Sequence, residues 1–229
     1  MIRILNIETA SSLCSVSVTE DGKTILYKDS SKPNSHSSHL AGMVNELYAE
    51  MKSKPSAVAV SIGPGSYTGL RIGLSLAKGL AFRWEIPLIA VSTLKIIAAG
   101  YLLENKPSLK TLLCPMMDAR RNEVYMAVYD IDLNQIIQPM PVVLDKINVS
   151  QLFPSGKFIV MGNGAEKASR FLTDPVFIFE KKTYLSAKAM QDISHEMYGR
   201  QEFADTAYQS PEYLKEFEAI KPKVQGHKI

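Results

Sequence analysis

The sequence lacks several features that would place the protein in a specialised class. Only two of its 229 residues are cysteines, Cys14 and Cys114, and each stands alone in an apolar segment. Isolated buried thiols are typical of a reducing compartment, so no disulfide framework is expected. No apolar run approaches the roughly 18 residues that a membrane span requires. The first residues lead at once to the polar Asn6 and Glu8, unlike a signal peptide, so we expect a cytoplasmic protein without membrane contact.

The sequence also lacks a strong charge imbalance. Its net charge of +3 is too small, over this length, to indicate nucleic-acid binding by charge alone. A hydrophobic share of 46% and a charged share of 21% are ordinary for globular proteins. The composition therefore predicts one large or two small globular domains.

The most informative stretch runs from Ser61 to Gly73 and reads SIGPGSYTGLRIG. It follows an apolar run, 57–62, that predicts a buried strand, and it precedes a helical pattern that ends near Trp84. In a strand, glycine-rich turn and helix, backbone N–H groups at the helix start can face an anion. The turn matches neither G-x-x-x-x-G-K-[ST] nor G-x-G-x-x-G, so it is a weak nucleotide motif by spacing alone.

The helix after this turn carries small residues at every fourth position, which places them along one face. A surface of such small side chains lets another backbone come unusually near. This spacing fits a helix packed tightly on its own sheet, and it equally fits a helix made for a partner. The stripe is formed by Gly69, Gly73, Ala77 and Ala81, and the large residues Leu70, Leu74, Leu76 and Leu80 flank it.

An amphipathic helix is predicted earlier in the chain, between residues 40 and 51. His36 and His39 lie three residues apart near its start, where they could share a metal on a helix. No third ligand is apparent nearby, and a histidine pair of this kind is usually a solvated helix start, so we predict no metal site. The apolar stripe of the helix consists of Leu40, Met43, Val44, Leu47, Tyr48 and Met51.

Two segments have the arrangement of a phosphate-binding turn. The first is a predicted strand, 2–8, that ends in the carboxylate of Glu8 and continues into a small polar turn and a returning strand, as in actin-like proteins and sugar kinases. An ordinary meander with a surface glutamate fits the pattern equally well. The second is a glycine turn, 162–164, between a short strand and a helix. The candidate phosphate contacts from these segments and the turn after Ser61 are Glu8, Thr9, Gly63, Gly65, Gly162 and Gly164.

The order of predicted elements divides the chain into two lobes near residue 105. A β-α-β unit ends the first lobe, 1–105, and implies a parallel strand pair. Lys106-Pro107-Ser108 then breaks the pattern before a smaller second lobe, 106–229, that begins with three predicted strands. The last predicted helix, 186–198, belongs to that lobe or packs back on the first. The chain is therefore predicted to have an α/β fold.

These segments together resemble the TsaB (YeaZ) family, the bacterial partner subunit in making threonylcarbamoyladenosine on tRNA. The resemblance covers most of the chain and is weaker in its last third, where Lys215 stands in place of the usual arginine. It implies the two-lobed fold of actin, sugar kinases and Hsp70 (the ASKHA fold), with a reduced second lobe. The segments that carry it are 4–10 (ILNIETA), 61–73, 77–81 (AKGLA), 86–94 (IPLIAVSTL) and 117–125 (MDARRNEVY).

The chain is also similar to TsaD, the larger catalytic relative of TsaB. In TsaD two histidines help to hold the catalytic metal, and their positions fall on Thr93 and Ile97 of this sequence. A neutral hydroxyl is a weak metal ligand, and isoleucine offers none. The resemblance therefore implies a chain without catalytic residues or a metal.

The resemblance implies a scaffold that pairs with TsaD, the pair then recruiting the small ATPase TsaE. The complex transfers a threonylcarbamoyl group to the adenosine beside the anticodon of ANN-decoding tRNAs, and the chain meets tRNA only within it. Alone, the chain would form a homodimer through the same helices, and Gly73→Leu or Ala77→Trp would break TsaD binding without unfolding the monomer. The predicted partner interface is Leu40, Met43, Val44, Leu47, Gly69, Leu70, Gly73, Leu74, Ala77 and Ala81.

The alternative is an ATP-dependent phosphotransferase or hydrolase of the actin-like fold that acts alone. Such enzymes need carboxylates around Mg²⁺, and only Glu8 and Asp118 lie near predicted strand ends. A peptidase lacks support, because neither a metal pair nor a Ser-His-Asp grouping can be read from the sequence. No cofactor is implied, although a nucleotide held without chemistry in a vestigial cleft, or at the TsaD interface, stays open.

Overall fold

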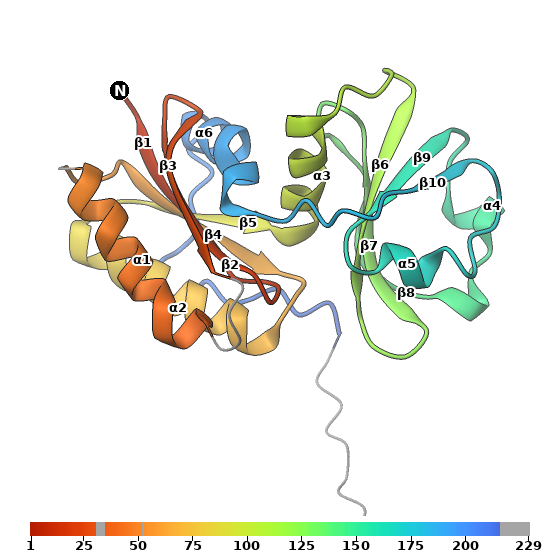
Figure 1. Cartoon of the computed structure of the whole chain (residues 1–229), viewed down its shortest axis with the longest axis horizontal. Coiled ribbons are helices and arrows are strands. Elements are labelled where there is room, and N and C mark those ends of the chain that lie inside the picture. The colour runs from red at the N-terminus through yellow and green to blue at the C-terminus, as the bar shows by residue number, and fades with distance from the viewer. Residues whose placement is uncertain (31–34, 52, 216–229) are drawn as a thin grey trace, which may run out of the picture.

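A computed structural model describes residues 1–30, 35–51 and 53–215 of the chain. Two five-stranded mixed sheets lie side by side, with helices on their faces (Figure 1). The strand order is β3-β2-β1-β4-β5 in the first sheet and β10-β9-β6-β7-β8 in the second. No helix among the described residues is both long and apolar enough to cross a membrane.

The first sheet is parallel at its centre. β1 pairs antiparallel with β2 and parallel with β4, and β4 pairs parallel with β5. The carboxyl ends of β1, β4 and β5 therefore meet at one edge of the sheet, where open α/β sheets usually hold their ligands. Its strands are β1 (Arg3–Glu8), β2 (Cys14–Glu20), β3 (Lys23–Ser30), β4 (Ala57–Gly63) and β5 (Leu88–Ser92).

Helices cover both faces of this sheet because its strands are apolar on both sides. Leu5 and Ile7 of β1 pack with the apolar sides of α1 (Ser35–Met51) and α2 (Tyr67–Trp84), the two helices that the sequence predicted for this part of the chain. Ile4, on the opposite face, packs with the other set of helices. That set contains α3 (Thr93–Glu104), the short 3₁₀ helix η2 (Ala187–Met190) and α6 (Gln191–Gly199).

The second sheet has a core of its own, built around Phe153, Phe158 and Phe177. The chain passes to this sheet between the end of α3 and the start of β6. It returns afterwards, because η2 and α6 lie on the first sheet, where the Thr24 hydroxyl donates to Gln191 Oε1 at 2.9 Å. The elements are β6 (Thr111–Asp118), β7 (Glu123–Tyr129), β8 (Gln135–Val143), η1 (Leu144–Lys146), α4 (Val149–Leu152), β9 (Lys157–Met161), α5 (Ala165–Ala168) and β10 (Phe177–Phe179).

A continuous apolar core joins the two sheets. Helix α3 is buried on nearly all sides, so Ile97 and its neighbours share one cluster with Leu113 of β6 and Tyr129 of β7. Figure 1 shows α3 between the sheets. Side chains from both lobes therefore pack together around α3.

Residues 204–215, here called the strap, connect the lobes a second time. The strap begins at the edge of the first sheet, where the Ala204 N–H donates to Leu88 O at 2.8 Å. It then follows α2, whose Lys78 Nζ donates to Ala207 O at 2.8 Å. It ends in an ion pair between Lys215 and Glu123 of β7. Figure 1 shows this path in blue.

Candidate functional site

Glu8 stands at the carboxyl end of β1, where the actin-like arrangement predicted a phosphate contact. Its side chain is fully buried, and Oε1 accepts a hydrogen bond of 2.6 Å from the Ala10 N–H. Burial raises the pKa of Glu8 to about 7, because the bonds from Ala10 and the Ser61 hydroxyl offset the loss of water only in part. Its other oxygen, Oε2, has no partner among the described groups. Glu8 is therefore neither a surface residue nor open to a ligand.

The first glycine turn is packed against the chain's own carbonyl groups. A Cβ atom at Gly63 would lie 2.6 Å from Glu212 O of the strap, and one at Gly65 would lie 2.5 Å from Ala10 O. These glycines permit close backbone packing. Carbonyl oxygens repel an anion, so this geometry gives no support to a phosphate site here.

The second glycine turn is filled in the same way. A Cβ atom at Gly162 would lie 2.3 Å from Met116 O, and one at Gly164 would lie 3.0 Å from the Met117 carbonyl carbon. Beside the turn, Lys167 Nζ lies 2.5 Å from Asp118 Oδ1. Partial burial opposes ionisation of Asp118, but Lys167 and a backbone N–H hold its pKa below the usual value. The cation that a phosphate would need is thus already neutralised.

The positions that correspond to the TsaD metal ligands lie inside the core. Thr93 and Ile97 are both fully buried in α3. Neither residue lines the cavity at the end of α2 or the cavity beside α4. No group of three or more metal-ligating side chains is found among the described residues. His39 is exposed near the start of α1, while the side chain of His36 lies outside the described set. The described part of the chain thus holds no cluster suited to a metal.

The residues of the predicted partner interface face the interior of this chain. Gly69 and Gly73 face Thr9 of the β1–β2 turn. A Cβ atom at Gly69 would lie 2.1 Å from Thr9 O, and a Cβ atom at Gly73 would lie 2.2 Å from Thr9 Oγ1. This geometry favours packing within the chain for the small stripe, and Gly73→Leu would place its side chain against Thr9. Contact of this face with a partner stays a prediction. All the predicted residues are buried within this chain: Leu40, Met43, Val44, Leu47, Gly69, Leu70, Gly73, Leu74, Ala77 and Ala81.

The opposite side of the same helices is accessible, and its composition is unusual. We call it the outer helical face. Tyr48 of α1 stacks on Trp84 of α2 with ring centroids 5.0 Å apart, which ties the two helices together. A Cβ atom at Gly42 or Gly79 would meet no other atom within 4 Å. The face comprises exposed Ala41, Gly42, Tyr48, Ala49 and Gly79 and half-buried Ile72, Leu76 and Leu80.

Sequence reasoning missed this face because it followed only the most regular stripe of each helix. The available signal was that α2 is apolar over more than one stripe, since Ile72, Leu76 and Leu80 lie outside the buried set. A helix that packs on one side alone normally carries charged residues on the other. Ile72, Leu76 and Leu80 pack partly against the core of the first sheet and keep part of their apolar surface exposed.

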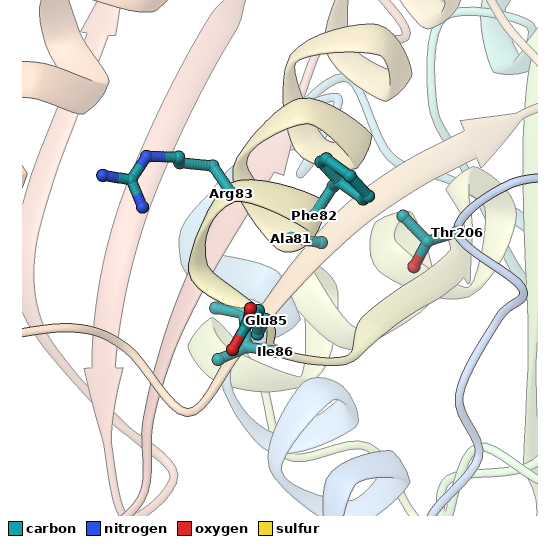
Figure 2. Close-up of a pocket in the computed structure, with 6 residues that line it drawn as sticks. All are labelled: Ala81, Phe82, Arg83, Glu85, Ile86 and Thr206. Carbon is teal, nitrogen blue, oxygen red and sulfur yellow. The ribbon is translucent and has the colours of Figure 1, made fainter.

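The two cavities described for the structure lie away from the predicted phosphate contacts. One, of about 450 Å³, is at the end of α2 and is lined by Phe82, Glu85 and Thr206 among others (Figure 2). The second, of about 700 Å³, lies beside α4 in the second lobe. Neither includes Glu8 or a glycine turn, so the structure does not bring the predicted phosphate contacts together around a cavity.

Comparison with known proteins gives consistent matches. A family model described as TsaD, tRNA N6-adenosine threonylcarbamoyltransferase, matches residues 30–221. The tRNA threonylcarbamoyladenosine biosynthesis protein TsaB of Escherichia coli is 38% identical over 138 residues, or 59% of this chain and 58% of that protein. The Bacillus subtilis TsaB is 33% identical over 141 residues, or 60% of this chain and 59% of that protein. These matches thus span less than two thirds of either relative.

Solved structures agree with the sequence matches. A Pseudomonas aeruginosa protein described as similar to peptidase YEAZ has a TM-score of 0.82 and 25% identity, covering 94% of this chain and all of that one. A putative N-acetylmannosamine kinase from Listeria monocytogenes has a TM-score of 0.52 and 11% identity, over 87% of this chain and all of that one, and shows the fold alone. The predicted two-lobed actin-like α/β fold is therefore confirmed. The chain belongs to the family that the TsaD model defines, and within it to the TsaB (YeaZ) group.

Proposed function

We propose that this protein is a non-catalytic subunit in the biosynthesis of threonylcarbamoyladenosine on tRNA, and that it pairs with TsaD. The observation that carries the proposal is the packing around Glu8 and the first glycine turn. Where an actin-like ATPase would hold phosphate and metal, the chain places its own carbonyl groups and a buried, uncompensated carboxyl group. The relatives are named for tRNA threonylcarbamoyladenosine biosynthesis, and these names are the basis for placing this chain in that pathway.

The alternative, an independent ATPase, is disfavoured by the same geometry. A magnesium nucleotide site needs several oxygen ligands on the metal and donors on the phosphates. Burial shields the Glu8 carboxyl group from solvent and raises its pKa to about 7, and the carboxylate of Asp118 is paired with Lys167. Neither group is free to hold Mg²⁺.

The outer helical face is the surface that we assign to TsaD. Small residues on adjoining helices allow another helix to approach closely, and the half-buried aliphatic side chains supply apolar area. In the absence of TsaD, a second copy of the chain would occupy the same face as a homodimer. TsaE and tRNA would then be recruited by the pair.

Size-exclusion chromatography with light scattering tests the proposal, on this chain alone and mixed with TsaD of the same organism. We expect a homodimer that gives way to a heterodimer. Gly42→Arg and Gly79→Arg should abolish both assemblies without unfolding the monomer, because both positions are open and arginine favours a helix more than glycine does. Gly199→Arg, at an equally open glycine at the end of α6, is the matched control and should assemble normally.

Each contrary result has a definite meaning. Normal TsaD binding by Gly79→Arg would place the interface elsewhere on the chain. Failure of the unmodified protein to bind TsaD, with or without nucleotide, would contradict the scaffold function. ATP turnover by the isolated chain would favour the enzymatic alternative.

A further inference from the structure

Tyrosines and an arginine cluster where the strap leaves α2. The Arg71 guanidinium lies 4.1 Å from the ring centroid of Tyr67, and its Nε donates to the Tyr213 hydroxyl at 2.9 Å. The rings of Tyr67 and Tyr213 stack with centroids 5.3 Å apart. Tyr67 is nevertheless 44% exposed and Tyr213 45% exposed. The cluster is therefore an ordered aromatic surface that solvent reaches.

An ion pair and a backbone hydrogen bond connect the end of the strap to a second group of cations. Lys215, two residues after Tyr213, pairs with Glu123, whose N–H donates to Arg120 O at 3.1 Å. Arg120 and Arg121 form the exposed β6–β7 turn, with φ angles of +67° and +44°. Among the residues that the structure describes, neither arginine lies within salt-bridge distance of a carboxylate. The β6–β7 turn, with its two arginines, is thus joined to the end of the strap through Glu123 and Lys215.

We propose that this tyrosine–arginine patch, formed by Tyr67, Arg71, Arg120, Arg121, Tyr213 and Lys215, binds an unpaired segment of RNA. The proposal rests on the proposed function, in which the RNA is the tRNA substrate. Aromatic rings stack unpaired bases of any sequence, and arginines contact the phosphates between them. The patch extends over both lobes, so it can follow several nucleotides. An acidic peptide would use the cations but gain little from the rings.

The net charge of the whole chain does not exclude this surface, because charge acts locally. Two carboxylates beside the turn are paired, Asp118 with Lys167 and Glu123 with Lys215, while Asp145 contacts the side-chain amide of Asn122. Arg120 and Arg121 still add two positive charges to the local field that a polyanion meets at the turn.

Fluorescence anisotropy with the complex of the full-length chain and TsaD, and a labelled anticodon stem-loop RNA, tests the proposal. The main variant is Arg120→Asn combined with Arg121→Gly. Both new residues accept a positive φ more readily than arginine does, so the turn should fold at least as well. If each arginine contacts one phosphate of the unpaired loop, the slope of log K against log salt should fall by about 1.4, at about 0.7 per contact.

The aromatic part is tested separately. Tyr213→Ala should weaken stem-loop binding about 5- to 150-fold, the range measured for stacking of one base. Tyr213→Phe should bind nearly as well as the unmodified chain, since it keeps the ring and loses only the hydrogen bond from Arg71. Fully paired RNA should bind more weakly than the stem-loop.

Lys23→Asn combined with Arg200→Asn removes the same number of positive charges from another part of the surface and is the control. An equal loss in this control, or unchanged binding by the turn variant, would overturn the proposal. Stronger competition by polyglutamate than by the stem-loop would also overturn it, in favour of an acidic protein. TsaD binding of the turn variant should be normal, so a failed RNA result stays separate from a failure of the proposed function.

Discussion

Glu8 is the residue whose environment differs most from what its position in the sequence suggests. Its carboxyl group is fully buried without a counter-charge, and its pKa is raised from 4.5 to about 7. A group with a raised folded-state pKa contributes stability that is fully present below the unfolded pKa. That contribution is lost as the pH rises through the folded pKa.

We therefore predict that Glu8→Gln changes the pH dependence of stability. The unmodified protein should lose about 3 kcal/mol relative to the variant between pH 4.5 and pH above 7, since each pKa unit is worth about 1.4 kcal/mol. Urea unfolding at pH 4.5 and at pH 8 measures the difference. Parallel stability curves for the two proteins would show that the pKa of Glu8 is the same in the folded and unfolded states, against this prediction.

The role of Glu8 was only partly predictable from the sequence. The strand and its terminal carboxylate are local features, and both are present as predicted. The burial of Glu8 depends on distant segments, including Ser61 of β4. A local pattern carries no information on which remote segment covers a strand end, so the surface and phosphate interpretations could not be separated.

At the scale of one element, α2 contains glycines with opposite roles. A Cβ atom at Gly69 would lie 2.1 Å from a backbone oxygen, Thr9 O, while one at Gly79 meets nothing. We predict that Gly69→Ala lowers the free energy of unfolding by about 1–3 kcal/mol, because the backbone must shift to accept the methyl group. Gly79→Ala should raise it by up to about 1 kcal/mol, because alanine favours the helix.

Denaturant unfolding of the two variants checks this pair directly. Equal effects of the two substitutions would mean that helix propensity alone decides the stability of α2 and that the close contact with Thr9 is unimportant. The sequence predicted the small stripe of α2 correctly but left its partner open. The partner is the β1–β2 turn, far away in the sequence, and spacing along one helix says nothing about what lies against it.

At the scale of the whole molecule, the two lobes are less independent than their order in the sequence suggests. Predicted lobes 1–105 and 106–229 correspond to separate sheets, but the first sheet uses later residues to cover one face. The Ser17 hydroxyl donates to Ala187 O, and the Ala187 N–H donates to Ser15 Oγ, both at 2.9 Å. The strap then binds the lobes together again. Such returns join residues from 92 to 172 positions apart and leave no periodic signal.

A core that is continuous between the lobes predicts one cooperative unfolding transition. Trp84, the only tryptophan, lies in the first lobe and reports on it by fluorescence, whereas Phe158 lies in the core of the second lobe. We predict that Phe158→Ala lowers the unfolding midpoint seen by Trp84, at a cost of about 3–5 kcal/mol. Ile178→Ala, at a half-exposed position of the second sheet, should leave the midpoint nearly unchanged.

Separate unfolding of the lobes would instead leave the Trp84 transition in place while far-ultraviolet circular dichroism showed an earlier loss of structure. Coincident transitions by both probes would mean that α3 makes the two sheets a single folding unit, which suits a rigid scaffold better than an enzyme that opens and closes around a nucleotide.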